Sequence, residues 1–148
     1  MSGIIIRSLA AAGLTILLDQ GSKWLAVLKG IVVVNPGAAF SIGVGGSTIV
    51  LWGSVVGLIG LLLWWPTAPK DDKVLLTFIL AAGFSNLVDR LTFGGVRDFI
   101  HLPSFFTWFP VFNVADLIFG KTQVLTYERH QGRDTKPAKE AAEEGDPR

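Results

Sequence analysis

Two short segments place an aspartate at the edge of an apolar stretch. They are residues 96–100, which contain Asp98, and residues 112–116, which end at Asp116. A carboxylate next to lipid is costly to desolvate and usually marks a functional site. The two aspartates lie 18 positions apart, across a segment that can fold back on itself. The sequence therefore predicts a site built on a pair of carboxylates.

A carboxylate pair suits acid–base chemistry on water. Two like charges held close cannot both ionise cheaply, so one carboxyl keeps its proton. The ionised partner deprotonates a bound water, and the protonated partner polarises the carbonyl of a scissile peptide. The chain has no cysteine, which excludes disulfides, thiolate zinc sites and a thiol nucleophile. No His, Asp or Glu cluster has metal-ligand spacing, so no metal and no cofactor are expected.

Three apolar stretches must position these carboxylates. Half of the 148 residues are apolar and only 17% are charged, a composition typical of a membrane protein. Residues 4–28, 48–65 and 74–91 are each about as long as a helix needs to be to cross a bilayer. After Asp116 the apolar run is short. We expect an all-α transmembrane fold with three clear helical spans and a truncated fourth segment.

Two further elements are expected on the outer side. Residues 30–47 combine β-branched flanks with an Asn-Pro-Gly turn, which favours a small hairpin-like β element. Residues 95–112 form an aromatic loop suited to anchoring at the headgroups. Arg7, Lys70 and Lys73 place the N-terminus in the cytoplasm by the positive-inside rule, so the β element and the loop are extracytoplasmic.

The C-terminal end differs in composition. Residues 130–148 carry more than a third of all Lys, Arg, Asp and Glu side chains and have no apolar face, which predicts a disordered polar tail. Residues 1–129 then form the membrane-embedded domain. Net charge is close to zero and no basic block occurs, so no nucleic-acid partner is expected.

Other polar side chains gather on the predicted outer side. Asp19 and Lys23 are spaced i, i+4 on one helix and can pair, and Asn86 and Arg90 share a helix face in the same way. The complete set is Asp19, Lys23, Asn35, Asn86, Asp89, Arg90, Asp98, Asn113 and Asp116.

Five of these polar segments, in this order, resemble the motifs of the lipoprotein signal peptidase (signal peptidase II) family. The resemblance runs over residues 4–119, which is most of the chain, and the five segments together are far more specific than any one alone. The segments are Asp19-Gln20-Gly21-Ser22-Lys23, Asn35-Pro36-Gly37-Ala38-Ala39-Phe40-Ser41, Asn86-Leu87-Val88-Asp89-Arg90, Gly95-Val96-Arg97-Asp98-Phe99 and Phe112-Asn113-Val114-Ala115-Asp116.

The resemblance implies an intramembrane aspartic endopeptidase of the bacterial inner membrane. Its substrates would be diacylglyceryl-modified prolipoproteins, cut just before the lipidated cysteine, and the enzyme would be a multi-pass monomer with its active site on the extracytoplasmic side, in contact with membrane lipid. Asp98 and Asp116 would be the catalytic pair. Asn35, Asn86, Arg90 and Asn113 would shape the site and hold substrate, and Asp19 and Lys23 would support the fold beside it.

Three other readings stay open from the sequence. A relative that binds lipopeptides without cleaving them fits the short fourth segment, because Asp116 would then lack a rigid support. Intramembrane carboxylates also occur in proton-coupled transporters. Finally, each polar side chain taken singly could be an interfacial cap or ion pair.

Overall fold

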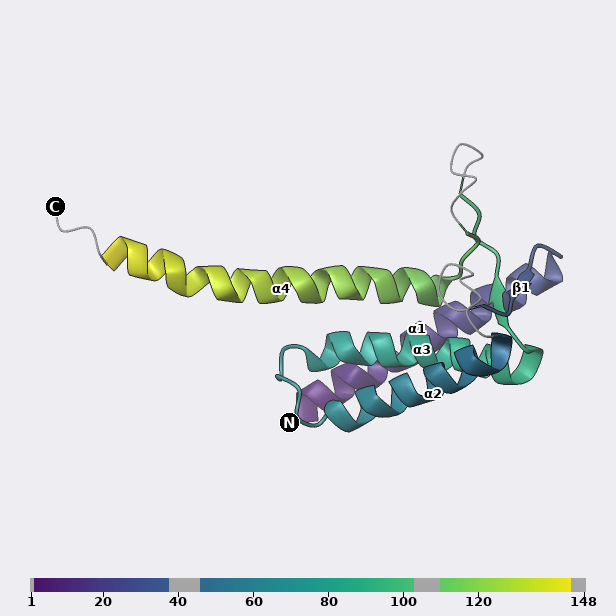
Figure 1. The fold of residues 1–148 in the computed structure, drawn as a ribbon, viewed down its shortest axis with the longest axis horizontal. Helices are drawn as coiled ribbons and strands as arrows, with labels where there is room; N and C mark the ends of the chain where they lie inside the picture. Colours follow the sequence, from purple (N-terminus) through teal and green to yellow (C-terminus); the bar gives the residue numbers. More distant parts are fainter. Residues whose placement is uncertain (1, 38–45, 103–109, 145–148) are drawn as a thin grey trace.

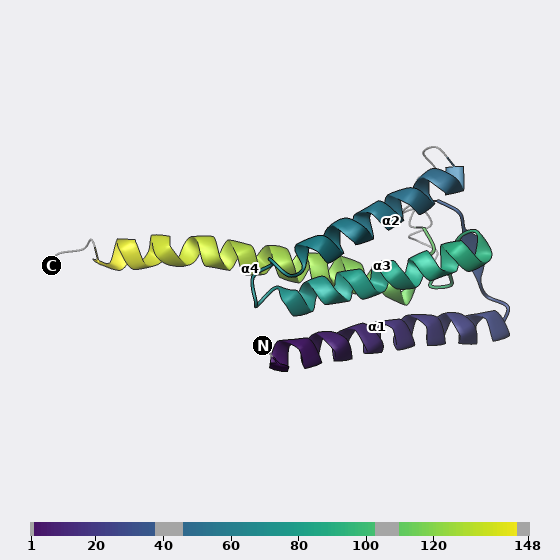
Figure 2. The ribbon, with the colours of Figure 1, turned by 90° about the horizontal axis from the view of Figure 1, so that it is seen from below.

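Four helices and a two-stranded sheet make up the part of the chain that the computed structural model describes, residues 2–37, 46–102 and 110–144. In chain order the elements are α1 (Ser2–Leu28), β1 (Val33–Asn35), α2 (Gly46–Trp64), α3 (Lys73–Phe93), β2 (Val96–Asp98) and α4 (Val114–Glu144). Helix α3 lies between α1 and α2, as Figure 2 shows, and α4 packs against α3 and α1. The strands lie at the end of the bundle opposite the N-terminus (Figure 1).

The helix α1 is polar inside and apolar outside. Its buried positions recur every three or four residues and are small or polar: Ser8, Ala11, Thr15, Asp19, Lys23 and Ala26. Large apolar side chains such as Leu9 and Leu17 are about 70% exposed, at 68% and 73%. A helix in water shows the reverse pattern, whereas small and polar contacts between helices are typical of a bilayer. This arrangement fits a membrane protein.

Two of the three expected spans meet the requirements of length and composition. The helices α1 and α3 are long and apolar enough to cross a membrane. The apolar part of α2 that the structure describes, Thr48–Trp64, is shorter, so α2 stays a predicted span.

The expected β element is present, and the partner of its described strand comes from another part of the chain rather than from residues 30–47. β1 pairs antiparallel with β2, with Val33 opposite Asp98 and Asn35 opposite Val96. Gly94 ends α3 with a φ of 73°, a conformation that glycine adopts without strain, and so turns the chain directly into β2. The rest of the predicted element, residues 38–45, lies outside the described residues.

The base of the expected aromatic loop is closed by backbone hydrogen bonds. Ile100 and Phe112 form an antiparallel bridge, in which each N–H donates to the other's carbonyl, at 2.8 and 3.2 Å. This closure brings Asp98, which precedes the bridged segment, next to Asn113, which follows it. The loop's remaining aromatics, Phe105, Phe106, Trp108 and Phe109, lie outside the described residues.

The fourth helical segment was expected to be truncated, and this expectation of its length is wrong. α4 continues for 31 residues and projects well beyond the bundle (Figure 1). The apolar run after Asp116 is short, but helix formation also depends on end capping and on helix-forming polar residues. In the described part of the chain, α4 is not among the helices with an apolar stretch long enough to span a bilayer.

Most of the segment that was expected to be a disordered tail belongs to the helix α4. The helix includes residues 130–144, although residues 130–148 were expected to be disordered. Alanine, glutamate and lysine favour a helix, so a polar composition that gives little burial does not by itself oppose helix formation. The division into a domain over 1–129 and a tail over 130–148 stays a prediction.

Gly95→Ala tests how closely β1 and β2 approach. A methyl group at Gly95 would lie 2.8 Å from the backbone oxygen of Asn35, so the strands must separate. We expect the unfolding free energy to fall by about 1–3 kcal/mol, measured by denaturant titration in mixed micelles. Gly13→Ala is the control, because nothing lies within 4 Å of its added methyl. Equal stability of the two variants would contradict the strand contact.

Candidate active site

The ammonium group of Lys23 is the centre of a buried polar cluster between α1 and α3. Its Nζ atom lies 2.6 Å from Asp19 Oδ2 and 3.0 Å from Asp89 Oδ2, and it donates to Asn86 Oδ1 at 2.8 Å. The Lys23, Asp19 and Asp89 side chains are 0% exposed. A lysine has three N–H donors, and all three have an acceptor. Asp19 and Lys23 are therefore not an interfacial ion pair.

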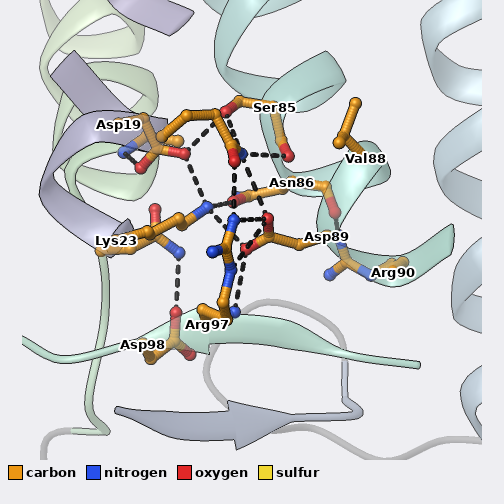
Figure 3. Close-up of polar contacts among 12 residues, drawn as sticks. Asp19, Lys23, Ser85, Asn86, Val88, Asp89, Arg90, Arg97 and Asp98 are labelled. Atoms are coloured by element: carbon orange, nitrogen blue, oxygen red, sulfur yellow. Dashed lines mark hydrogen bonds and ion pairs between the residues drawn. The ribbon is translucent and has the colours of Figure 1, made fainter. Parts of the chain in front are cut away.

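A second cation completes the cluster. Arg97 Nη2 lies 2.7 Å from Asp89 Oδ1, and the Arg97 backbone N–H donates to Asp89 Oδ2 at 3.0 Å. Ser85 Oγ donates to Asp19 Oδ2 at 2.7 Å and accepts from Gln20 Nε2 at 2.9 Å. Figure 3 shows these side chains converging on Asp19 and Asp89 from both helices and from β2. The two carboxylates are matched by two cations.

The cluster also fixes the first turn of α4. The free N–H groups of a helix start need acceptors, and Asp19 Oδ1 accepts the N–H of Ala115 at 2.8 Å. Asn113 precedes the helix, and its Oδ1 accepts the N–H of Asp116 at 3.0 Å, while Asp116 Oδ2 accepts the N–H of Asn113 at 3.3 Å. This reciprocal pair is a capping box. Asp116 is therefore held at the start of a long helix rather than on a loose segment.

Three asparagines each turn an amide N–H₂ group towards an aspartate. In each, another group holds the amide oxygen: the Gly37 N–H for Asn35 at 2.9 Å, Lys23 for Asn86, and the Asp116 N–H for Asn113. Because the nitrogen and the oxygen of an amide point in different directions, fixing the oxygen directs each Nδ2 atom towards an aspartate.

The donors of these asparagines reach both aspartates. Asp98 accepts Nδ2 of Asn35 on Oδ2 at 3.0 Å and Nδ2 of Asn113 on Oδ1 at 2.7 Å. Asp116 accepts Nδ2 of Asn86 on Oδ1 at 3.0 Å. Asn113 therefore donates to both carboxylates, to Asp98 through its side-chain amide and to Asp116 through its backbone N–H.

Both aspartates open onto one cavity of about 750 Å³. Polar groups line the end of the cavity near the strands, and these are Asn35, Asn86, Arg90, Asp98 and Asp116. The remainder is lined mainly by apolar side chains of α2, α3 and α4, among them Leu58, Leu61, Ile79, Leu117 and Phe119, together with the polar residues Ser54, Lys121 and Gln123. The site therefore combines a pair of carboxylates with a largely apolar channel between helices.

The environment of Asp98 favours its protonated form. Burial raises the pKa of Asp98 above its ordinary value, and the nearby charge of Asp116 raises it further. The amide donors of Asn113 and Asn35 and the charge of Lys23 act in the opposite direction, and the pKa stays raised. A carboxyl with a raised pKa next to a second carboxyl can hold and transfer a proton.

The structure brings most of the predicted site residues together. Asn35, Asn86, Arg90, Asp98 and Asp116 face the cavity, and Asn113 bonds to both aspartates. Asp19 and Lys23 do not line the cavity and lie in the buried cluster instead.

Sequence reasoning assigned no role to Gln20, Ser85 or Arg97, all of which bond within the cluster. The signal available was a polar residue in an otherwise apolar helix or strand. Among the described residues, no group of three or more His, Asp or Glu side chains is placed to hold a metal ion.

Comparison with known proteins gives a consistent result. A family model described as signal peptidase (SPase) II matches residues 11–125. The lipoprotein signal peptidase of Polynucleobacter necessarius is 35% identical over 133 residues, covering 76% of this chain and 81% of the relative. That of Acinetobacter baumannii is 36% identical over 124 residues, covering 70% of each.

Two solved structures share the fold. Both are described as bacterial membrane enzymes, solved at 2.3 and 1.9 Å, and both are 24% identical to this chain. The first has a TM-score of 0.71 and covers 88% of this chain and 90% of its own. The second has a TM-score of 0.66 and covers 82% and 90%.

Replacing Lys23 tests the dependence of the fold on the buried cluster. Lys23→Met leaves Asp19 and Asp89 without their shared cation, and removing one partner of a buried ion pair costs about 3–5 kcal/mol. We expect that loss in the unfolding free energy, measured by denaturant titration in mixed micelles. Lys29→Met, at an exposed position one residue beyond α1, should change it by less than about 0.5 kcal/mol. A Lys23 variant as stable as the Lys29 variant would show that the cluster is dispensable.

Proposed function

The chain belongs to the signal peptidase II family and removes signal peptides from prolipoproteins, and on that premise we propose that it is an aspartic endopeptidase whose catalytic pair is Asp98 and Asp116. One observation carries the proposal. Both carboxylates open onto a single cavity and both are bonded to Asn113, which holds them side by side at the end of an apolar channel.

The pair divides the work of peptide hydrolysis. One carboxylate takes a proton from a bound water, and the water oxygen attacks the carbonyl carbon of the scissile peptide. The other carboxyl gives its proton to the carbonyl oxygen, which produces a tetrahedral diol. The C–N bond then breaks as the nitrogen takes a proton. The products are the signal peptide, which now ends in a free carboxylate, and the mature protein, which begins with the free amine of the cysteine. The single catalytic proton belongs to the pair rather than to either residue.

The asparagines keep the pair in working geometry. Asn35 and Asn113 each donate to one oxygen of Asp98, and Asn86 donates to Asp116. A catalytic group must be held within about 0.5 Å of its productive position. Each amide is itself oriented by a further bond, so the site is supported before substrate arrives.

Arg90 supplies donors for the substrate backbone. Its Nη1 and Nη2 atoms donate to the Asn86 and Gly37 carbonyls, whereas its buried Nε has no hydrogen-bond partner among the described residues. A buried donor without a partner is costly. Arg90 also lines the cavity, which supports a substrate-holding role for its guanidinium.

The channel suits a lipid-bearing substrate. Its walls are mainly apolar and lie between α2, α3 and α4, so an apolar signal helix or an acyl chain could enter laterally from the bilayer. We infer that the substrate is the diacylglyceryl-modified prolipoprotein, cut just before the modified cysteine. We place the enzyme in the bacterial inner membrane as a multi-pass monomer, with its site on the extracytoplasmic side and in contact with lipid.

The alternative, a relative that binds lipopeptides without cleaving them, has no support from the comparisons. Its basis was the short fourth segment, which would have left Asp116 without a rigid support. α4 runs from Val114 to Glu144 and is capped by Asn113 and Asp19, which supports a fixed position for Asp116.

Replacing either aspartate should abolish the chemistry. We expect Asp98→Asn and Asp116→Asn each to lower the rate of prolipoprotein cleavage by about 10²–10⁴-fold, because the amide can neither take nor give the catalytic proton. The assay uses purified enzyme in lipid with a diacylglyceryl-modified prolipoprotein. Asp71→Asn is the matched control, since Asp71 is exposed in the connection between α2 and α3. Wild-type rates in both Asn variants would refute the catalytic pair.

Asn35→Ala should move the pH profile in a defined direction. Asn35 lowers the pKa of Asp98 by donating to its carboxylate, so removing that donor raises the pKa further. Activity needs one proton on the pair and is lost when that proton leaves, so the alkaline limb of kcat/KM shifts to higher pH. Gln131→Ala, on the exposed part of α4, should leave the limb unchanged. A shift to lower pH would contradict the assignment.

A further inference from the structure

We propose that Arg97 is a positioning residue for the cleavage reaction, which locks β2 against α1 and α3 and thereby places Asp98 at the cavity. The inference rests on the proposed role of Asp98 and extends it to a side chain that does not reach the cavity.

The side chain of Arg97 points to the opposite face of β2 from those of Val96 and Asp98. Successive side chains of a strand point to opposite faces, and Val96 and Asp98 line the cavity whereas Arg97 does not. Arg97 instead extends from β2 towards Asp89 of α3, as Figure 3 shows. All three residues of β2 are buried. Arg97 therefore determines how the back of this strand sits on the helices.

The contact with Asp89 fixes both the backbone and the side chain of Arg97. Asp89 Oδ2 accepts the Arg97 backbone N–H at 3.0 Å, and Asp89 Oδ1 accepts Nη2 at 2.7 Å and Nε at 3.3 Å. A planar guanidinium fork makes such multiple bonds with one carboxylate, and lysine cannot reproduce them. The peptide group between Val96 and Arg97, one residue before Asp98, is thus tied to α3.

Two further contacts fix the direction of the guanidinium. Nη2 donates to Gln20 Oε1 of α1 at 2.6 Å, and the guanidinium carbon lies 4.4 Å from the centre of the Phe93 ring, within the range of a cation–π contact. β2 is only three residues long and pairs with one other strand. A ribbon of two short strands is barely stable by itself, so the position of Asp98 depends on Arg97.

Arg97 also balances the charge of the buried cluster. With Arg97 present, Asp19 and Asp89 face two cations, and without it they share Lys23 alone. The cluster would then carry a net negative charge close to Asp98. Lys23 helps to lower the pKa of Asp98, so an excess negative charge beside it would raise that pKa.

Two substitutions separate positioning from charge. Arg97→Met removes the fork and the charge, and Arg97→Lys removes the fork alone. We expect Arg97→Met to lower kcat for prolipoprotein cleavage about 10- to 100-fold, with KM near the wild-type value and the alkaline limb moved to higher pH. Arg97→Lys should lower kcat by a smaller factor and keep the wild-type limb. Lys29→Met, at an exposed position one residue beyond α1, is the control and should match the wild type.

The proposal is overturned if Arg97→Met keeps the wild-type kcat, or if its loss of kcat comes with an unshifted alkaline limb. Should Arg97→Met fail to fold in lipid, Arg97→Lys decides: a folded Lys variant with reduced kcat supports the proposal, and one with wild-type kcat overturns it. Asp98→Asn is assayed beside them. If that variant still cleaves, the proposed catalytic pair fails, independently of the result at Arg97.

Discussion

The ammonium group of Lys23 is the contact on which the rest of the site depends. Its three acceptors belong to α1 and α3, and they are Asp19, Asp89 and Asn86. Asp19 in turn accepts a backbone N–H of α4, and Asp89 holds β2. Asn86 has its amide oxygen held by Lys23, so its donor faces Asp116. A single buried charge thus orders the helices and strand that carry both aspartates.

The surroundings explain why so many charges lie in the interior. Large apolar side chains cover the outside of α1, α2 and α3, as a bilayer requires. Lipid offers polar groups no partners, so they gather between the helices and must satisfy one another. Two carboxylates, two cations and the amides around them achieve this with hydrogen bonds of 2.6–3.3 Å. The polar interior gives a specific helix packing that apolar contacts alone would leave undefined.

The sequence allowed the polar motifs to be predicted better than the connections between them. Asp19 and Lys23 were expected to pair from their spacing, and they do. The pairing of β1 with β2 was missed because it joins residues 61 to 65 positions apart, and local turn signals at Asn-Pro-Gly favoured a hairpin. The length of α4 was missed because its start is stabilised by Asp19, from another helix. Contacts between distant segments leave no local periodicity.

The i, i+4 spacing of Asp19 and Lys23 has a consequence for how the protein is made. The first helix enters the membrane before the helix that bears Asp89 and Asn86 has been synthesised. A lone buried charge would resist insertion, but the two opposite charges lie one turn apart and can pair within the nascent helix itself. The Asp19–Lys23 pair therefore enters the membrane with no net charge. Asp89 and Asn86 can bind Lys23 only after α3 has been synthesised. The same ion pair therefore lowers the cost of inserting α1 and later holds α1 against α3.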